Sequence, residues 1–243
     1  SSSSAASDVY KRQYDDDSAY IRHWQKDPAP APHLRDALKM SQEHVTSAPA
    51  VDAAAKDIQN TSPLGIQEHI ASLLHQYPQA VTEVVLLPTK DGQPVISRDI
   101  WISEHLKRIL RDINAPWVSG ILNECHNSDT CHAMRVGEDT YMCRAHDDGR
   151  LCTAREYISH TIDAASEQLQ STKPISTSEG MRLPRPSHQL FSLVCKQLAR
   201  IFSHIYLHHH NLFQRCEETT SLYARFKRLT KTFDLMPDEL LLM

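Results

Sequence analysis

The stretch His204-Ile-Tyr-Leu-His208-His209-His210 decides how this chain is expected to fold, because it places several imidazoles inside a long run with helical spacing. Far upstream, Cys125 and Cys131 form a C-x5-C pair. Two thiols and two imidazoles are the donors of a closed tetrahedral zinc site. If these groups meet, a metal ion connects the middle of the chain to its C-terminal helices and stabilises the fold.

The spacing of the histidines leaves open which of them would share an ion. On a regular helix His204 and His208 lie on one face, four residues apart. His209 stands roughly 140° around the helix from His204, so these two meet only where the helix bends or restarts. Spacing alone therefore favours His204 with His208. The gap from Cys131 to His204 is also far longer than the roughly a dozen residues of a small DNA-reading finger.

Four further cysteines lie outside this set. Cys143-x2-His146-x5-Cys152 has three open interpretations: it joins the first site, forms another metal site, or consists of buried thiols beside an ordinary loop histidine. The last is the main interpretation. Cys195 and Cys216 lie on or beside an apolar stripe, where packing in the core is expected.

Composition favours a helical protein. The chain has 243 residues, of which 40% are hydrophobic and only 6 are glycine. Glycine this scarce favours helices over a turn-rich β architecture. A net charge of −4 and a pI near 6.4 argue against a dedicated nucleic-acid binder. No apolar run reaches the ~18–20 residues of a membrane span, and no secretory signal is visible, so the cysteines are expected in a reducing compartment.

The order of elements predicts a mostly α fold, a helical bundle. Residues 1–60 are expected to form a disordered or loosely ordered tail, and residues 62–243 the domain. Helices are predicted at 63–77, from Asp99 to Ile113, at 117–122, at 154–169, from Ser187 along the apolar stripe to Phe213, and after Thr219 or Thr220. Val84–Leu87 is predicted to be a short strand or a buried extended segment. Residues 126–153 are predicted to be loop or short strands.

Particular residues predict where the first helix begins and which face of the last helix is exposed. Ser62 and Pro63 provide an N-cap followed by proline at the first helical position. The basic run Arg225, Lys227, Arg228 and Lys231 on the last helix is expected to be a solvated face, with docking of an acidic partner segment as the alternative.

Several segments together resemble the Mob/phocein family, and its phocein branch in particular. The matching pieces are Trp101-Ile-Ser-Glu-His-Leu, Glu124-Cys-x5-Cys131-x2-Met134, Cys143-x2-His146-x5-Cys152, Tyr157-x2-His160-Thr-x-Asp163, Arg200-Ile-Phe-Ser-His-x-Tyr-x-His-His209 and Asp234-Leu-Met236. The resemblance extends over residues 62–243. It implies a Mob-type helical bundle with a short β or loop insertion, stapled by one structural zinc.

The resemblance also implies the zinc ligands: Cys125, Cys131, His204 and His209. It favours His209 over His208, because the family helix is interrupted at this point, and His208 stays as the reserve ligand. The family pair of cysteines usually encloses four residues, whereas five lie between them here. This extra residue leaves His126 as a rival to Cys125.

The function implied by the resemblance is that of an adaptor without catalytic activity. No hydrolase, P-loop or kinase signature is present in the sequence. Relatives that activate kinases carry a basic pocket for phosphorylated Ser/Thr motifs. The corresponding residues are Lys196 and Arg200, with Gln197 in place of a basic residue, which is expected to weaken the pocket; a solvated basic face is the alternative.

The partners implied by the phocein branch are those of STRIPAK: a striatin-like scaffold, a type 2A serine/threonine phosphatase and a Ste20-type kinase. The Cys143/His146/Cys152 cluster and Gln197 favour this interpretation. The alternative is a co-activator that binds an NDR/LATS-type kinase directly, and a metal-dependent hydrolase is the third hypothesis. The expected location is cytoplasmic, with association at the periphery of endomembranes suggested by the same branch.

Overall fold

The computed structural model describes residues 53–125, 131–137, 139–143, 145–146, 151–177, 180–183 and 187–242. Most of the expected N-terminal tail, residues 1–52, lies outside the described residues. Residues 53–56 form a helical turn. Ala55 of this turn is buried with Leu73 and Val84 in a small apolar cluster.

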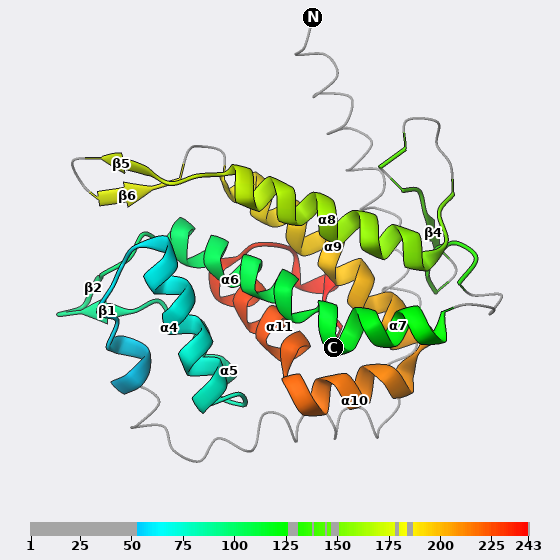
Figure 1. Ribbon diagram of the computed structural model, residues 1–243, viewed down its shortest axis with the longest axis horizontal. Coiled ribbons are helices and arrows are strands. Elements are labelled where there is room, and N and C mark those ends of the chain that lie inside the picture. The colour runs from blue at the N-terminus through cyan, green and yellow to red at the C-terminus, as the bar shows by residue number, and fades with distance from the viewer. Residues whose placement is uncertain are drawn as a thin grey trace, which may run out of the picture.

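The described chain is mostly helical, which confirms the predicted fold class (Figure 1). The helices are α4 (Pro63–Gln76), α5 (Val81–Val85), α6 (Arg98–Asp112), α7 (Ser119–Glu124), α8 (Ala154–Ser171), α9 (Ser187–His208), α10 (His210–Thr220) and α11 (Leu222–Phe233). A π-helical turn, Asn114–Val118, precedes α7, and a 3-10 turn, Asp238–Leu240, follows α11.

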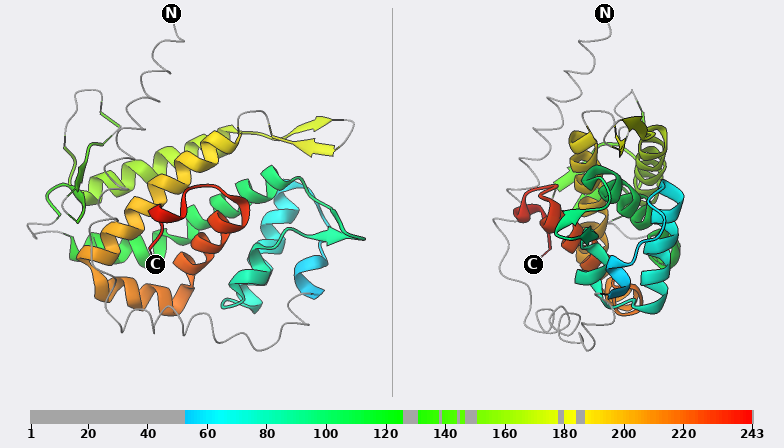
Figure 2. Two further views of the ribbon diagram at one scale, coloured as in Figure 1. Left: turned by 180° about the vertical axis from the view of Figure 1, so that it is seen from behind. Right: turned by 90° about the vertical axis from the view of Figure 1, so that its left-hand side faces the viewer.

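Short hairpins account for the strands in the described residues. They are β1 (Thr89–Lys90) with β2 (Gln93–Pro94), β3 (Met134–Val136) with β4 (Asp139–Tyr141), and β5 (Ile175–Thr177) with β6 (Gly180–Arg182). Each pair is antiparallel. The β3–β4 hairpin is the short β insertion that the resemblance implies, and it lies beside α8 at the end of the molecule where α7 and α10 also lie (Figures 1 and 2).

Helix α6 is central to the bundle, because it contacts α4, α8, α9 and α11. Removal of apolar side chains from water is the main force that holds such a bundle together. Trp101 of α6 and Trp117 of the π-helical turn are among the largest fully buried side chains. The Trp117 ring packs edge-on against Phe202 of α9 and Phe213 of α10, so one aromatic cluster joins three segments.

The start of α4 is as predicted, whereas the next segment is not. The Ser62 hydroxyl accepts a hydrogen bond from the Gly65 amide at 3.2 Å, and Pro63 is the first helical residue. Val84 and Val85, expected in an extended segment, belong to the helix α5. Both are fully buried, and α5 packs on α11. Burial against a partner helix here outweighs the preference of β-branched residues for strands.

Two predicted helix caps are wrong, and a third is confirmed only in part. Asp99 lies inside the first turn of α6, whose N-cap residue is Ser97. Ser187 is the first residue of α9, and its hydroxyl donates to Asp99 at 3.2 Å. The residue before α11 is Ser221, which has a φ of 46° and makes no side-chain capping hydrogen bond. Of the two predicted threonines, Thr220 still takes part, because its hydroxyl accepts a hydrogen bond from the Leu222 amide at 3.3 Å.

The apolar stripe from Ser187 to Phe213 is predicted as one helix but forms two. Helix α9 ends at His208, and α10 begins at His210. Between them His209 has a φ of −138° and a ψ of 48°, outside the helical region. This single residue turns the chain, and it does so beside the group of cysteines and histidines described next.

Candidate metal centre

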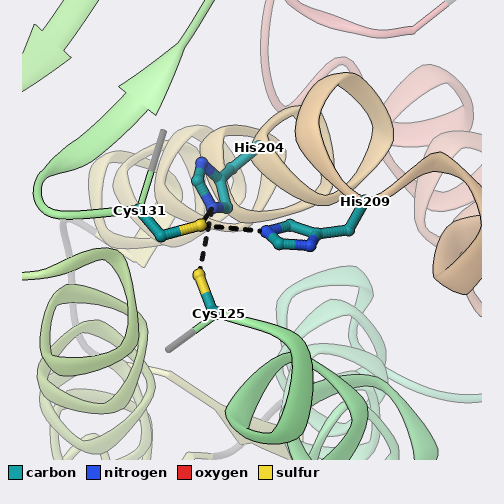
Figure 3. A group of neighbouring side chains, drawn as sticks. All are labelled: Cys125, Cys131, His204 and His209. Atoms are coloured by element: carbon teal, nitrogen blue, oxygen red, sulfur yellow. Dashed lines mark hydrogen bonds between the residues drawn. The ribbon is translucent and has the colours of Figure 1, made fainter. Parts of the chain in front are cut away.

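Four buried donors converge from three parts of the chain (Figure 3). Cys125 ends α7, Cys131 precedes β3, His204 lies on α9, and His209 lies at the break before α10. The Sγ atom of Cys131 is 4.0 Å from His204 Nε2 and 3.2 Å from His209 Nε2. Cys125 Sγ lies 3.8 Å from His204 Nε2. Metal bonds of ~2.0–2.3 Å in a tetrahedron separate their donors by about 3.3–3.8 Å, so these residues could hold one metal ion.

The hydrogen bond of His204 prepares this ring for metal binding. Its Nδ1 is 2.7 Å from the Arg135 carbonyl oxygen, and a carbonyl can only accept, so Nδ1 carries the proton. The lone pair is then on Nε2, which faces the thiols. Burial lowers the pKa of His204 to about 4, so the ring is neutral near pH 7. A second partner on the far nitrogen is typical of histidines that bind metals.

Burial also shifts the pKa values of His209 and Cys125. Burial lowers the pKa of His209, and Glu124 partly opposes this effect from 3.6 Å, the distance between His209 Nδ1 and Glu124 Oε2. Glu124 is held in turn by Arg215, at 2.8 Å. Burial raises the pKa of the Cys125 thiol. A divalent cation would reverse this preference, since a thiol that coordinates such an ion is deprotonated.

The structure brings His209 rather than His208 to this group. The ring of the half-buried His208 lies 5.0 Å from that of His204, with the ring planes tilted by 48°, but its nitrogens are not among the converging donors. The spacing argument for His208 assumes one continuous helix, and the break at His209 removes that assumption. His126, the rival to Cys125, lies outside the described residues.

A second group of four donors follows the β3–β4 hairpin in the sequence. It contains the predicted Cys143, His146 and Cys152 and adds His160 of α8. His160 Nδ1 lies 3.3 Å from Cys143 Sγ and 3.7 Å from Cys152 Sγ. The His146 and His160 rings are 5.1 Å apart. These four donors also could hold a metal ion, separate from the first group.

His160 as a donor is missed by the sequence analysis, although it belongs to a segment that carries the family resemblance. The signal that could have found it is a histidine two turns into a helix whose N-cap residue, Thr153, directly follows Cys152. The other two cysteines, Cys195 and Cys216, are buried in the core, as predicted.

The two basic residues of the expected pocket on α9 differ in their exposure to solvent. Lys196 is half-buried, whereas Arg200 is only 4% exposed. The Arg200 guanidinium carbon lies 4.7 Å from the centre of the Tyr141 ring, which places a cation on the face of an aromatic ring. Arg200 therefore belongs to the contact between α9 and the β3–β4 hairpin rather than to a fully solvated face.

The later basic run on α11 is not the uniform solvated face that was expected. Arg225 is buried and forms an ion pair with Asp112 of α6. Lys227 donates to the Leu242 carbonyl at 2.9 Å, and Lys231 pairs with Asp238 at 3.0 Å. These contacts attach α11 to α6 and to the C-terminal residues.

No helix among the described residues is both long enough and apolar enough to cross a membrane. The fold and the converging donors define a class of protein: an α-helical bundle in which distant segments meet at buried cysteine and histidine clusters.

The chain belongs to the Mob1/phocein family, whose profile matches residues 71–242. It is 30% identical to "MOB kinase activator-like 4" of Drosophila melanogaster over 183 residues, which is 75% of this chain and 78% of the relative. It is 28% identical to "MOB-like protein phocein" of Caenorhabditis elegans, with the same shares of both chains. It is 25% identical to "Maintenance of ploidy protein mob1" of Schizosaccharomyces pombe, over 68% of this chain and 82% of the relative. The chain is thus a member of a family of kinase regulators.

Proposed function

We propose that this chain is a non-catalytic adaptor subunit of a kinase–phosphatase assembly of the STRIPAK type, which contains a striatin-like scaffold, a type 2A serine/threonine phosphatase and a Ste20-type kinase. The observation that carries the proposal is the order of similarity within the family. The relative named phocein and MOB kinase activator-like 4 match at 28% and 30%, whereas the yeast mob1 matches at 25%. The proposed location of the assembly is cytoplasmic, at the periphery of endomembranes.

The proposed role of Cys125, Cys131, His204 and His209 is to bind one structural zinc ion. The two thiols and two imidazoles suit zinc, which prefers four such donors in a tetrahedron. The neutral His204 ring and its bond to Arg135 support the assignment. The ion would join α7, the segment before β3, and the α9–α10 break.

The donor set also favours an adaptor over a metal-dependent hydrolase. A catalytic zinc keeps one position open for water or substrate, with three protein ligands. Here four protein donors converge in each group, all of them buried in the first. An ion in either group would be closed to substrate, so we infer a structural rather than a catalytic role.

A second candidate function is co-activation of an NDR/LATS-type kinase by direct binding. One observation favours it, the kinase-activator name of the Drosophila relative. The net charge of −4 is compatible with binding of a basic kinase segment but does not discriminate between the two candidates. In this candidate function Lys196 and Arg200 bind a phosphorylated motif. Arg200 is held by Tyr141, so we infer that only the edge of its guanidinium would be offered to phosphate.

The experiment that tests the assignment is affinity capture of the tagged full chain from its own cells, with partners identified by mass spectrometry. Recovery of a striatin-like scaffold with phosphatase subunits is the expected result. Recovery of an NDR/LATS-type kinase without the scaffold would reverse the order of the two candidates.

Two variants sharpen the capture experiment. Lys196→Ala removes a half-buried cation of the proposed pocket, and Lys173→Ala removes an exposed lysine elsewhere as the control for loss of one positive charge. Loss of a kinase in the first variant alone would assign phosphate binding to α9. Capture that is unchanged in both variants would show that the partner binds without this pocket.

A further inference from the structure

In the sequence, the β3–β4 hairpin stands between a cysteine of the first donor group and a cysteine of the second. Cys131 of the first group stands shortly before β3, and Cys143 of the second group stands directly after Met142, which follows β4. The strands pair Met134 with Tyr141 at the open end of the hairpin, so both cysteines are near this same end in the sequence. An isolated two-stranded hairpin is marginally stable at best in water, and strands of three residues need support from outside.

The second group attaches this hairpin to α8. His160 lies on α8, and Cys152 stands just before Thr153, the N-cap residue of that helix. The cap is firm, because Thr153 and Glu156 form reciprocal capping hydrogen bonds. The Ala154 amide also donates to the Cys131 carbonyl at 3.0 Å, which links the start of α8 to the first group.

On its other side the hairpin meets α9. The Arg135 carbonyl of β3 accepts the hydrogen bond from His204, and the Tyr141 ring of β4 lies against the Arg200 guanidinium. Tyr141 is 1% exposed. Arg200 and His204 are one helical turn apart on α9. The position of Arg200 therefore depends on a short hairpin whose strand β4 leads, two residues after Tyr141, to Cys143 of the second donor group.

We propose that Cys143, His146, Cys152 and His160 bind a second metal ion of the zinc class, and that this ion holds β4 so that Tyr141 supports Arg200. Occupancy of the second group then sets the geometry of the Arg200 region of α9. The proposal rests on the proposed function in one respect, that Arg200 belongs to a surface used for partners.

The number of ions is tested first, by elemental analysis of the full chain after loading with zinc and removal of loosely bound ions. We expect two zinc ions per chain, and one in the Cys152→Ser and His160→Gln variants. Cys195→Ala, which removes a buried thiol outside both groups, keeps two. A wild-type chain with one ion, or a Cys152→Ser variant with two, would overturn the second site.

A titration of the wild-type chain tests the number of bound ions without depending on variants, which could fail to fold. The wild-type chain is stripped of its weaker ion by graded amounts of a chromophoric zinc chelator, and zinc release is followed by absorbance. Two separate release steps are expected. A single step that accounts for one ion per chain contradicts the proposal without any variant.

The coupling to Arg200 is tested by reciprocity, because two linked sites affect each other equally. Tyr141→Leu removes the ring under Arg200, and we expect it to lower zinc affinity at the second group by on the order of tenfold. Tyr141→Phe keeps the ring and the affinity. The control Met142→Leu changes an exposed neighbour, 47% exposed, and leaves the affinity unchanged. Unchanged affinity in Tyr141→Leu would overturn the coupling.

Hydrogen exchange provides the matching structural measurement. In Cys152→Ser, amide exchange over residues 134–142 is expected to accelerate about tenfold or more, because the hairpin loses its anchor to α8. Exchange in α6 stays as in the wild type. Faster exchange spread evenly over α6 and the hairpin would show general destabilisation instead. None of these measurements uses a partner, so failure of the adaptor assignment and failure of the second site are distinguishable.

Discussion

His105 is a fully buried histidine at the centre of α6, far from the donor groups in sequence, and it links the core to pH. Its ring packs edge-on to Trp101, with ring centres 4.6 Å apart. Burial, helped by the nearby charge of Arg225, lowers the pKa of His105 to about 3 from its usual 6.5. The folded chain therefore holds this ring neutral in a pH range where the unfolded chain binds a proton.

This difference predicts a loss of stability in acid. As the pH falls from 6.5 toward 3, the unfolded state gains a proton at His105 that the folded state excludes, so the free energy of unfolding decreases. The slope is about 1.4 kcal/mol per pH unit for one such group. His105→Asn is expected to reduce the slope of stability against pH, measured by urea unfolding at several pH values. His75→Asn, at an exposed position, serves as control, and an unchanged slope in His105→Asn contradicts the prediction.

Residue chemistry was predictable where the residue type itself limits the possibilities. Cysteines and histidines in a reducing compartment suggest metal ligands wherever they gather, so Cys125, Cys131 and His204 are apparent from the sequence. His160 is not, because its approach to Cys143 depends on how α8 packs. Arg225 reads as one more surface cation, and only the packing of α11 on α6 reveals its buried pair with Asp112.

At the scale of elements, the break between α9 and α10 determines which histidine reaches the first donor group. His208 ends α9, whereas His209 has non-helical dihedral angles and turns its ring toward Cys131. We expect His209→Ala to lose one bound metal ion and several kcal/mol of stability. His208→Ala, the neighbouring control, is expected to keep the ion. Elemental analysis with thermal unfolding checks both, and the opposite order would reassign the ligand.

The start of α11 depends on a carboxylate from the preceding helix. Glu217 of α10 accepts hydrogen bonds from the Tyr223 and Ala224 amides, both at 2.8 Å, and its side chain is buried. Glu217→Ala leaves two amides without this acceptor and is expected to cost about 2 kcal/mol. Glu218→Ala, at the exposed next position, is expected to change stability by less than about 0.5 kcal/mol. Equal urea midpoints for the two variants would contradict this role of Glu217.

Helix boundaries could be predicted from the sequence only where the residues that set them are close to the boundary in the chain. The Ser62 cap and the proline after it act within a few residues, so the start of α4 was predictable. The Tyr223 and Ala224 amides of α11 are capped by Glu217, a residue inside the previous helix, brought back by the left-handed turn at Ser221. No glycine or proline stands near His209 in the sequence to mark the break between the two helices. The resemblance to the family indicated it, whereas the apolar periodicity did not.

At the scale of the whole molecule, the two donor groups join elements that are distant in the chain. The first connects the end of α7 to the α9–α10 break, and the second connects the end of the β3–β4 hairpin to α8. Helices α8 and α9 also pack on α6, so both donor groups are attached to helices of the same core. The donor groups thus lie at one end of a bundle whose other contacts are mainly apolar.

Removal of metal is therefore expected to destabilise the whole chain rather than one loop. A structural zinc contributes its binding free energy to folding, and a loss of about 5 kcal/mol lowers the melting temperature by roughly 10–20 °C in a domain of this size. Calorimetry of the full chain before and after treatment with a strong chelator measures the shift, and elemental analysis verifies removal. Restoring zinc is expected to restore the original melting temperature, whereas restoring magnesium, which prefers oxygen donors, is not. A melting temperature that stays unchanged after complete metal removal would mean that apolar packing alone holds α7, α8 and the α9–α10 break together.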